Sequence, residues 1–279
     1  MSEPRTTTLP SEGIGTVLGI WAHPDDEAYL CAGLMASAAG AGHRVAVITA
    51  TAGELGTPDP ERWPPRRLAA LRRREMTASL AALGVTEHTW LEYPDGGCLL
   101  IPDDTAVAEI SDVIAAVAPD TIVTFGPDGM TGHPDHQAVS RWATAAWQAT
   151  RPTARLWYAT LLPSFHERWG ALNDHVGLFS PDTPPPCTDD ADAAAVVVSD
   201  GALLEAKMAA LDAHASQTRA LRAIVGDAAY RQWFRVEAFC DASRASLRAS
   251  ERSDAASRAS LRASERFDAV ADVLVGARA

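Results

Sequence analysis

Cysteine and long apolar stretches are both scarce in this chain. Four of its 279 residues are cysteines and no two form a CxxC pair, so we expect isolated, mostly buried thiols in a reducing compartment. The first residues show neither the apolar core nor the cleavage pattern of a signal peptide. No apolar run approaches the roughly 20 residues that a membrane-spanning helix needs. We therefore expect a cytoplasmic protein.

Positive charge is also in short supply, with 24 basic against 36 acidic side chains and a formal net charge of -12. Such a surface repels phosphate backbones and anionic lipid heads, so we expect neither a nucleic acid nor a membrane as partner. The sequence leaves open whether the chain forms a homo-oligomer. Hydrophobic residues make up 47% of the chain, which is enough for a substantial core.

Several common catalytic motifs are missing as well. The sequence contains no P-loop, no G-x-S-x-G and no H-E-x-x-H motif. Gly13 lies just before a predicted strand at 15–22, and Gly15 and Gly19 lie within it, whereas the glycines of a dinucleotide fingerprint must follow a strand and open a helix. Nucleotide binding of these kinds is therefore not expected.

Short apolar segments alternate with helical ones along the first part of the chain. We predict strands at 15–22, 44–50, 88–93, 121–125 and 155–162, and helices at 28–42, 66–83, 104–118 and 134–149. This alternation indicates an α/β fold, a Rossmann-like doubly wound and mostly parallel sheet with helices on both faces. Crossovers of this length are normally right-handed.

The remaining sequence is less regular. We assign residues 1–178 to the Rossmann-like catalytic core and 179–279 to a C-terminal region that completes the same domain. Within the latter we predict a surface loop at 180–192, a strand at 195–199, a helix at 201–215 and further helical segments. A tandem repeat occupies 243–269, where SRASLRASER recurs 14 residues after Ser243. It is either an interaction helix or a tolerated duplication in a peripheral helix.

Two histidine-rich turns follow predicted strands. The first strand runs into AHPDDE at 22–27, and GHPDH at 132–136 comes soon after the fourth strand. Ligands of open parallel sheets bind at the carboxyl ends of the strands. Three acids beside an imidazole repel one another unless a cation compensates them, and His and Asp are good ligands for zinc or a similar ion. The two turns therefore predict one metal site, although Asp25 or Asp26 alone would also serve as a helix N-cap.

These two motifs, in this order, resemble the paired signatures of the PIG-L/LmbE-like zinc-dependent N-acetylglucosaminyl deacetylases. The resemblance spans roughly residues 15–220. It also includes TATAGELG at 49–56, Arg72 with Glu75, Leu83-Gly84, the turn at 93–96, and the segments 207–211 and 214–217.

The resemblance implies a zinc-dependent amidohydrolase with one Zn²⁺ per chain and a small N-acyl amino-sugar substrate. It assigns His23, Asp26 and His136 as zinc ligands and Asp25 as the general base. It also implies that His133 assists the oxyanion and the leaving group.

For Arg72 and Asp95 the resemblance implies contacts with the substrate, although Arg72 also belongs to a run of arginines typical of a solvated face. Asp135 either orients a neighbouring imidazole or lies at the surface. His214 either lines the pocket or caps a helix end.

The residues alone leave other functions open. One is a metal-binding regulatory protein without turnover, and another is a metallohydrolase or amidase that acts on a different small conjugate. Asp25 separates the first from an enzyme, because a binding protein needs no spare carboxylate beside its metal.

Overall fold

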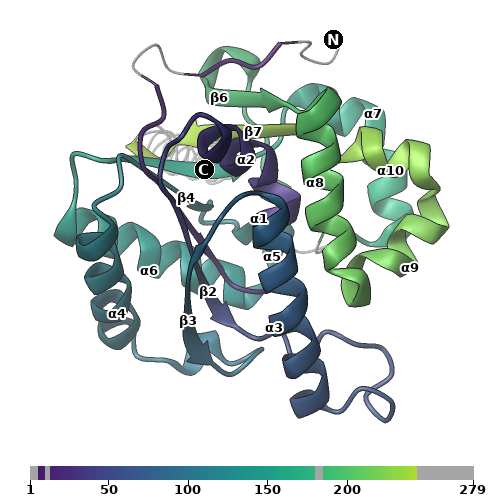
Figure 1. The fold of residues 1–279 in the computed structure, drawn as a ribbon, viewed down its shortest axis with the longest axis horizontal. Helices are drawn as coiled ribbons and strands as arrows, with labels where there is room; N and C mark the ends of the chain where they lie inside the picture. The colour runs from purple at the N-terminus through teal and green to yellow at the C-terminus, as the bar shows by residue number, and fades with distance from the viewer. Residues whose placement is uncertain (1–5, 10–12, 180–184, 244–279) are drawn as a thin grey trace, which may run out of the picture. The chain divides into compact units, whose positions relative to one another are not determined.

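The computed structural model describes residues 6–9, 13–179 and 185–243. Its elements alternate along the chain as the sequence predicted (Figure 1). They are β1 (Val17–Trp21), α1 (Asp26–Leu30), α2 (Ala32–Gly40), β2 (Val45–Thr51), α3 (Pro65–Ala82), β3 (Glu87–Tyr93), η1 (Cys98–Leu100), α4 (Asp103–Val117), β4 (Thr121–Phe125), α5 (Gly129–Gly132), α6 (Pro134–Thr150), β5 (Arg155–Thr160), α7 (Pro163–Val176), η2 (Asp190–Asp192), β6 (Ala193–Val198), α8 (Gly201–Ala213), α9 (Ala215–Val225), α10 (Asp227–Trp233) and β7 (Val236–Asp241).

Seven strands form one sheet in the order β3-β2-β1-β4-β5-β7-β6. The first five strands in this order are parallel to one another, and β7 runs antiparallel to both β5 and β6. In Figure 1, α4 and α6 lie on one side of the strands and α3 and α8 on the other. The predicted α/β fold with a mostly parallel sheet is confirmed.

Strand β1 is the centre of this sheet and pairs with both β2 and β4. All residues of these three strands are buried, because helices cover both faces of a parallel sheet. The chain order reverses between β1 and β4, and ligands bind at such a switch point, beyond the carboxyl ends of the strands. The fold thus places the ends of β1 and β4, each followed by a His-Pro-Asp turn, side by side.

Two predictions of secondary structure were wrong. The single helix expected at 28–42 is two helices, α1 and α2, separated by Cys31 at φ -146°. The segment after α8, expected to be helical throughout, ends in strand β7. Strand β7 was missed because Glu237 interrupts its apolar pattern, yet that side chain is buried.

The buried Glu237 explains how the break between α1 and α2 is held. Its carboxylate accepts hydrogen bonds from the backbone N–H groups of Gly33 (2.7 Å) and Leu34 (3.0 Å), in the first turn of α2. Lys207 of α8 lies 2.6 Å from the same carboxylate and donates to the carbonyl oxygen of Tyr29 at 2.9 Å. One buried ion pair therefore ties α8 and β7 to the two helices that follow β1.

We expect Lys207→Met to lower the free energy of unfolding by about 3–5 kcal/mol, because it leaves the buried Glu237 carboxylate without its cation. Urea unfolding followed by tryptophan fluorescence measures the loss. The matched control is Arg141→Met, which breaks a half-exposed ion pair with Asp103 and should cost about 1 kcal/mol or less. Equal losses in the two variants would contradict the importance of the buried pair.

By its contacts the chain divides into two units, Met1–Asp241 and Ala242–Ala279. The whole sheet, including β6 and β7 from the C-terminal region, belongs to the first unit. All but Ser243 of the tandem repeat at 243–269 lies outside the described residues. Among the described residues, no helix is long and apolar enough to cross a membrane.

Candidate active site

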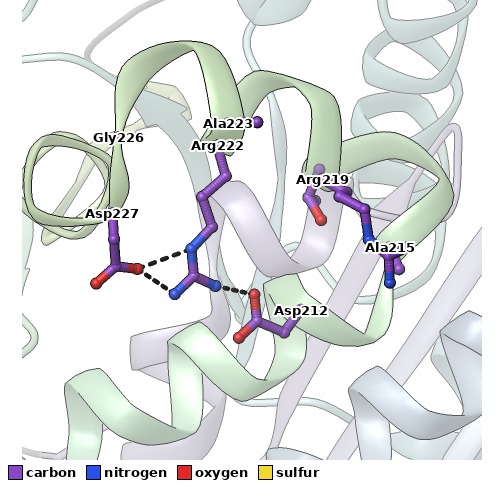
Figure 2. Close-up of a pocket in the computed structure, with 8 residues that line it drawn as sticks. Asp212, Ala215, Arg219, Arg222, Ala223, Gly226 and Asp227 are labelled. Carbon is purple, nitrogen blue, oxygen red and sulfur yellow. Dashed lines mark hydrogen bonds and ion pairs between the residues drawn. The ribbon is translucent and has the colours of Figure 1, made fainter.

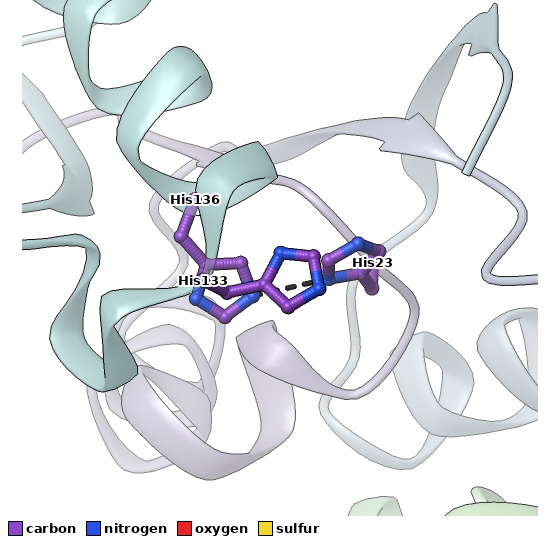
Figure 3. A group of neighbouring side chains, drawn as sticks. All are labelled: His23, His133 and His136. Atoms are coloured by element: carbon purple, nitrogen blue, oxygen red, sulfur yellow. Dashed lines mark hydrogen bonds between the residues drawn. The ribbon is translucent and has the colours of Figure 1, made fainter. Parts of the chain in front are cut away.

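The two His-Pro-Asp turns meet beyond the ends of β1 and β4. Nδ1 of His23 lies 3.0 Å from Nε2 of His136, and the ring of His133 lies 4.8 Å from that of His23, centre to centre. Figure 3 shows the three rings gathered, with a dashed line between His23 and His136. Residues more than 100 positions apart in sequence thus form one cluster.

Hydrogen bonds on the outer edges of the rings fix which nitrogens face inward. Nδ1 of His136 lies 2.9 Å from the carbonyl oxygen of Gly129, so Nδ1 carries the proton. The lone pair of Nε2 is therefore available to bind a metal. Nε2 of His23 lies 3.3 Å from Asp135 and 3.2 Å from Asp95, which leaves its Nδ1 facing inward. Imidazoles that bind metals are commonly held in this way by a carboxylate or a carbonyl group.

The carboxylate of Asp26 completes this group. Its Oδ1 lies 3.4 Å from Nε2 of His136, and its Oδ2 lies 3.7 Å from Nδ1 of His23. The backbone N–H of His23 donates to the same Oδ2 at 2.8 Å. Bonds of 2.0–2.2 Å to a tetrahedral zinc ion place ligand atoms about 3.4 Å apart. The three residues predicted as ligands therefore converge at spacings that suit a single metal ion.

Charge in the cluster fits the same conclusion. Burial by itself lowers the pKa of His23, but hydrogen bonds to Asp135 and Asp95 outweigh it and raise this pKa to about 10. Burial and the charge of His23 hold the pKa of His136 well below its usual value. A positive charge is thus favoured among these carboxylates, and a metal cation supplies one. Among the described residues, two further overlapping groups also lie close enough to hold an ion, His23 with His133 and His136, and His23 with Asp95 and Asp135.

Asp25 stands beside the cluster in a strained conformation. It occupies the N-cap position of α1 with φ 113° and makes no capping hydrogen bond through its side chain, so N-capping does not explain it. The left-handed region costs a residue with a side chain about 1–2 kcal/mol. Its Oδ2 lies 3.4 Å from Arg72. Burial raises the pKa of Asp25 to about 6, against the opposing charge of Arg72, which suits a base at neutral pH.

His133 presents a proton donor at the exposed edge of the cluster. Its Nδ1 accepts a hydrogen bond from the backbone N–H of Asp135 at 3.1 Å, so the neutral ring carries its proton on Nε2. Partial burial and the charge of His23 lower the pKa of His133. A neutral imidazole with a free N–H can stabilise a developing negative charge.

Arg72 and Asp95 lie close to the cluster, but their hydrogen bonds in the structure join them to other groups of the protein. Arg72 is only 3% exposed and donates to the carbonyl oxygens of Gly53 (2.7 Å) and Pro24. Asp95 accepts from the backbone N–H of Leu55 at 2.8 Å. Their predicted contacts with a substrate stay predictions.

Three further residues support the cluster. Asp135 is buried and accepts hydrogen bonds from the backbone N–H groups of Gly96 and Cys98 while it contacts His23, so it orients an imidazole and does not lie at the surface. Glu27 and His214 form a fully buried pair at 2.7 Å. Glu27 closes the AHPDDE motif, but its sequence position alone predicted no individual role for it.

A separate hollow of about 470 Å³ lies among α8, α9 and α10. Arg222 sits between Asp212 and Asp227 there and contacts both carboxylates (Figure 2). None of the residues predicted to carry chemistry lines this hollow. Both of its carboxylates are engaged by the single guanidinium group of Arg222.

Sequence comparisons connect the cluster to known enzymes. The family model described as PIG-L, GlcNAc-PI de-N-acetylase, matches residues 18–147, a span that contains both His-Pro-Asp turns. The chain is 32% identical to a 1D-myo-inositol 2-acetamido-2-deoxy-alpha-D-glucopyranoside deacetylase of Acidothermus cellulolyticus, over 73% of this chain and 80% of the relative. It is 34% identical to the enzyme of the same name from Mycobacterium sp. (strain KMS), over 75% and 76%.

Solved structures share the fold at lower identity. The N,N'-diacetylchitobiose deacetylase of Pyrococcus horikoshii aligns with a TM-score of 0.55 and 23% identity, over 83% of this chain and 85% of that one. The 4-carboxy-2-hydroxymuconate hydratase GalB of Pseudomonas putida KT2440 aligns with a TM-score of 0.54 and 16% identity, over 82% and 96%. One fold thus serves both deacetylases and a hydratase, so function must be argued from the site.

Proposed function

We propose that this chain, which belongs to the PIG-L family of GlcNAc-PI de-N-acetylases, is a zinc-dependent N-deacetylase. The substrate is a small molecule with an N-acetylglucosamine-type sugar, and the bond that breaks is its acetamide C–N bond. The observation that carries this proposal is the convergence of His23, Asp26 and His136, with Asp25 and His133 beside them.

His23, Asp26 and His136 would hold one zinc ion per chain. Two imidazole nitrogens and one carboxylate are a ligand set of catalytic zinc sites, which keep a further position open. When bound, zinc polarises the acetyl carbonyl group and makes the attacking water more acidic. Asp135 and Asp95 keep the His23 ring in the orientation that this requires.

Asp25 is the general base of the proposed reaction. Its carboxylate takes a proton from the attacking water, whose oxygen forms a bond to the acetyl carbon. The π electrons of the carbonyl group move onto oxygen and produce a tetrahedral oxyanion. Arg72, in contact with Asp25, keeps that carboxylate in place. The pKa of about 6 leaves Asp25 mostly ionised at neutral pH.

His133 stabilises the oxyanion through its Nε2–H. When the tetrahedral species collapses, the C–N bond breaks and its electron pair goes to nitrogen, which then needs a proton. The two groups that hold a proton at that stage are Asp25 and His133. Arg72 and Asp95, which contact Asp25 and His23 respectively, are proposed to contact the sugar hydroxyl groups.

A product screen tests the proposed function. We expect the zinc-loaded protein to release acetate and a free amine in equal amounts from one or more members of a panel of N-acetylglucosaminides. Acetate is measured enzymatically and the amine with a fluorescent reagent. Protein treated with a chelator is the control and should be inactive until zinc is restored. If protein that holds one zinc ion per chain releases no acetate from any member, the proposal is wrong.

A further inference from the structure

Glu27 is a carboxylate with no exposed surface, directly behind the proposed base. One oxygen, Oε2, accepts a hydrogen bond from the backbone N–H of Asp25 at 2.9 Å. The other, Oε1, accepts from Nε2 of His214 at 2.7 Å and from Oγ of Ser79 at 2.8 Å. Burial alone would raise the pKa of Glu27, but the charge of His214 and these hydrogen bonds lower it. Glu27 is therefore a buried acceptor whose two oxygens are both hydrogen-bonded.

The partners of Glu27 come from distant parts of the chain. Ser79 lies on α3, and His214 lies in the junction of α8 and α9. The position of Glu27 is thus fixed by two helices outside the loop that carries the catalytic motif. His214 has no exposed surface either, so solvent does not compete for this contact.

Asp25, whose backbone N–H donates to Glu27, has a strained backbone conformation. Asp25 adopts φ 113°, a conformation that a residue with a side chain keeps only when its surroundings enforce it. This turn sends two consecutive carboxylates to different partners, because Asp25 contacts Arg72 while Asp26 contacts His136. Arg72 holds the side chain of Asp25, and Glu27 holds its backbone.

We propose that Glu27, fixed by His214 and Ser79, is a positioning residue that keeps Asp25 in its left-handed turn and so determines where the general base stands. The catalytic consequence rests on the proposed deacetylase function. The geometric part does not, since it concerns only the backbone of Asp25.

The test compares substitutions that keep or remove the hydrogen-bonding groups. Glu27→Leu removes the acceptor and should lower kcat about 100-fold with little change in KM, since a displacement of about 1 Å can cost that much. Glu27→Gln keeps a carbonyl oxygen for the N–H of Asp25 and should retain most of kcat. In the same way, His214→Gln keeps an N–H donor and should exceed His214→Ala in kcat.

Glu75→Leu is the matched control. Glu75 is also a buried glutamate, and it accepts hydrogen bonds from the backbone N–H (2.8 Å) and Oγ (2.6 Å) of Ser216. It therefore loses two contacts between helices on substitution, but none with Asp25. This variant should lose stability and keep both kcat and the φ angle of Asp25.

Crystal structures of the variants provide a readout that does not require activity. In Glu27→Leu we expect Asp25 to leave the left-handed region, with zinc content unchanged. Folded Glu27→Leu protein with φ near 113° and wild-type kcat would overturn the inference, as would a loss of zinc in parallel with kcat. A wild-type protein without turnover would refute the deacetylase function, while the φ angle would still decide whether Glu27 positions Asp25.

Discussion

In the Asp25→Asn variant, kcat for deacetylation should fall by about 10²–10⁴-fold, because the amide cannot take the proton that the carboxylate takes from water. The backbone should tolerate this change, since asparagine is among the residues that enter the left-handed region most readily. Zinc should stay at one ion per chain, because the carboxylate of Asp25 contacts Arg72 and is not one of the proposed ligands. Steady-state kinetics and metal analysis by mass spectrometry of the same preparation measure both quantities.

Asp112→Asn is the control for this variant, since it makes the same chemical change at an exposed position of α4. It should have wild-type activity and zinc content. A parallel loss of zinc and activity in Asp25→Asn would instead make Asp25 a ligand, and unchanged kcat would remove it from the mechanism. Because the prediction separates metal content from turnover, it also distinguishes an enzyme from a protein that only retains a metal.

The centre of the fold could be predicted from the sequence because its strands are buried on both faces. A strand such as β4, Thr121–Phe125, consists entirely of buried β-branched and aromatic residues, so it can be recognised without knowing its neighbours. The same reasoning brought His23 and His136 together, because the carboxyl ends of parallel strands meet at one edge of the sheet.

Contacts between distant side chains could not be predicted in this way. Strand β7 contains Glu237, whose burial makes sense only with Lys207 beside it. In the sequence, Glu27 is simply one of the acids of AHPDDE, because no local feature shows that it pairs with His214, 187 positions away. The sequence pattern of a segment gives its periodicity, whereas the partner of a buried charge depends on how whole helices and strands pack together.

The His136→Ala variant should lose its metal. Its Nε2 is one of the three donor atoms that converge, and Nδ1 is anchored to the carbonyl oxygen of Gly129, so alanine removes a donor that the protein holds in place. Loss of a residue that merely orients a ligand costs about 10–100-fold in metal affinity. We expect loss of a ligand to cost at least about 100-fold, measured by competition with a chromophoric chelator.

His43→Ala is the control for that experiment, since His43 is an exposed histidine in the turn before β2, and it should bind zinc as the wild type does. Activity of His136→Ala should return only at zinc concentrations that match its weakened affinity. Full zinc occupancy at stoichiometric metal would show that His136 is not a ligand. In that case another group around His23 would hold the ion, most directly the one that includes Asp95 and Asp135. The contacts of Asp26 with the imidazoles would then have no role in metal binding.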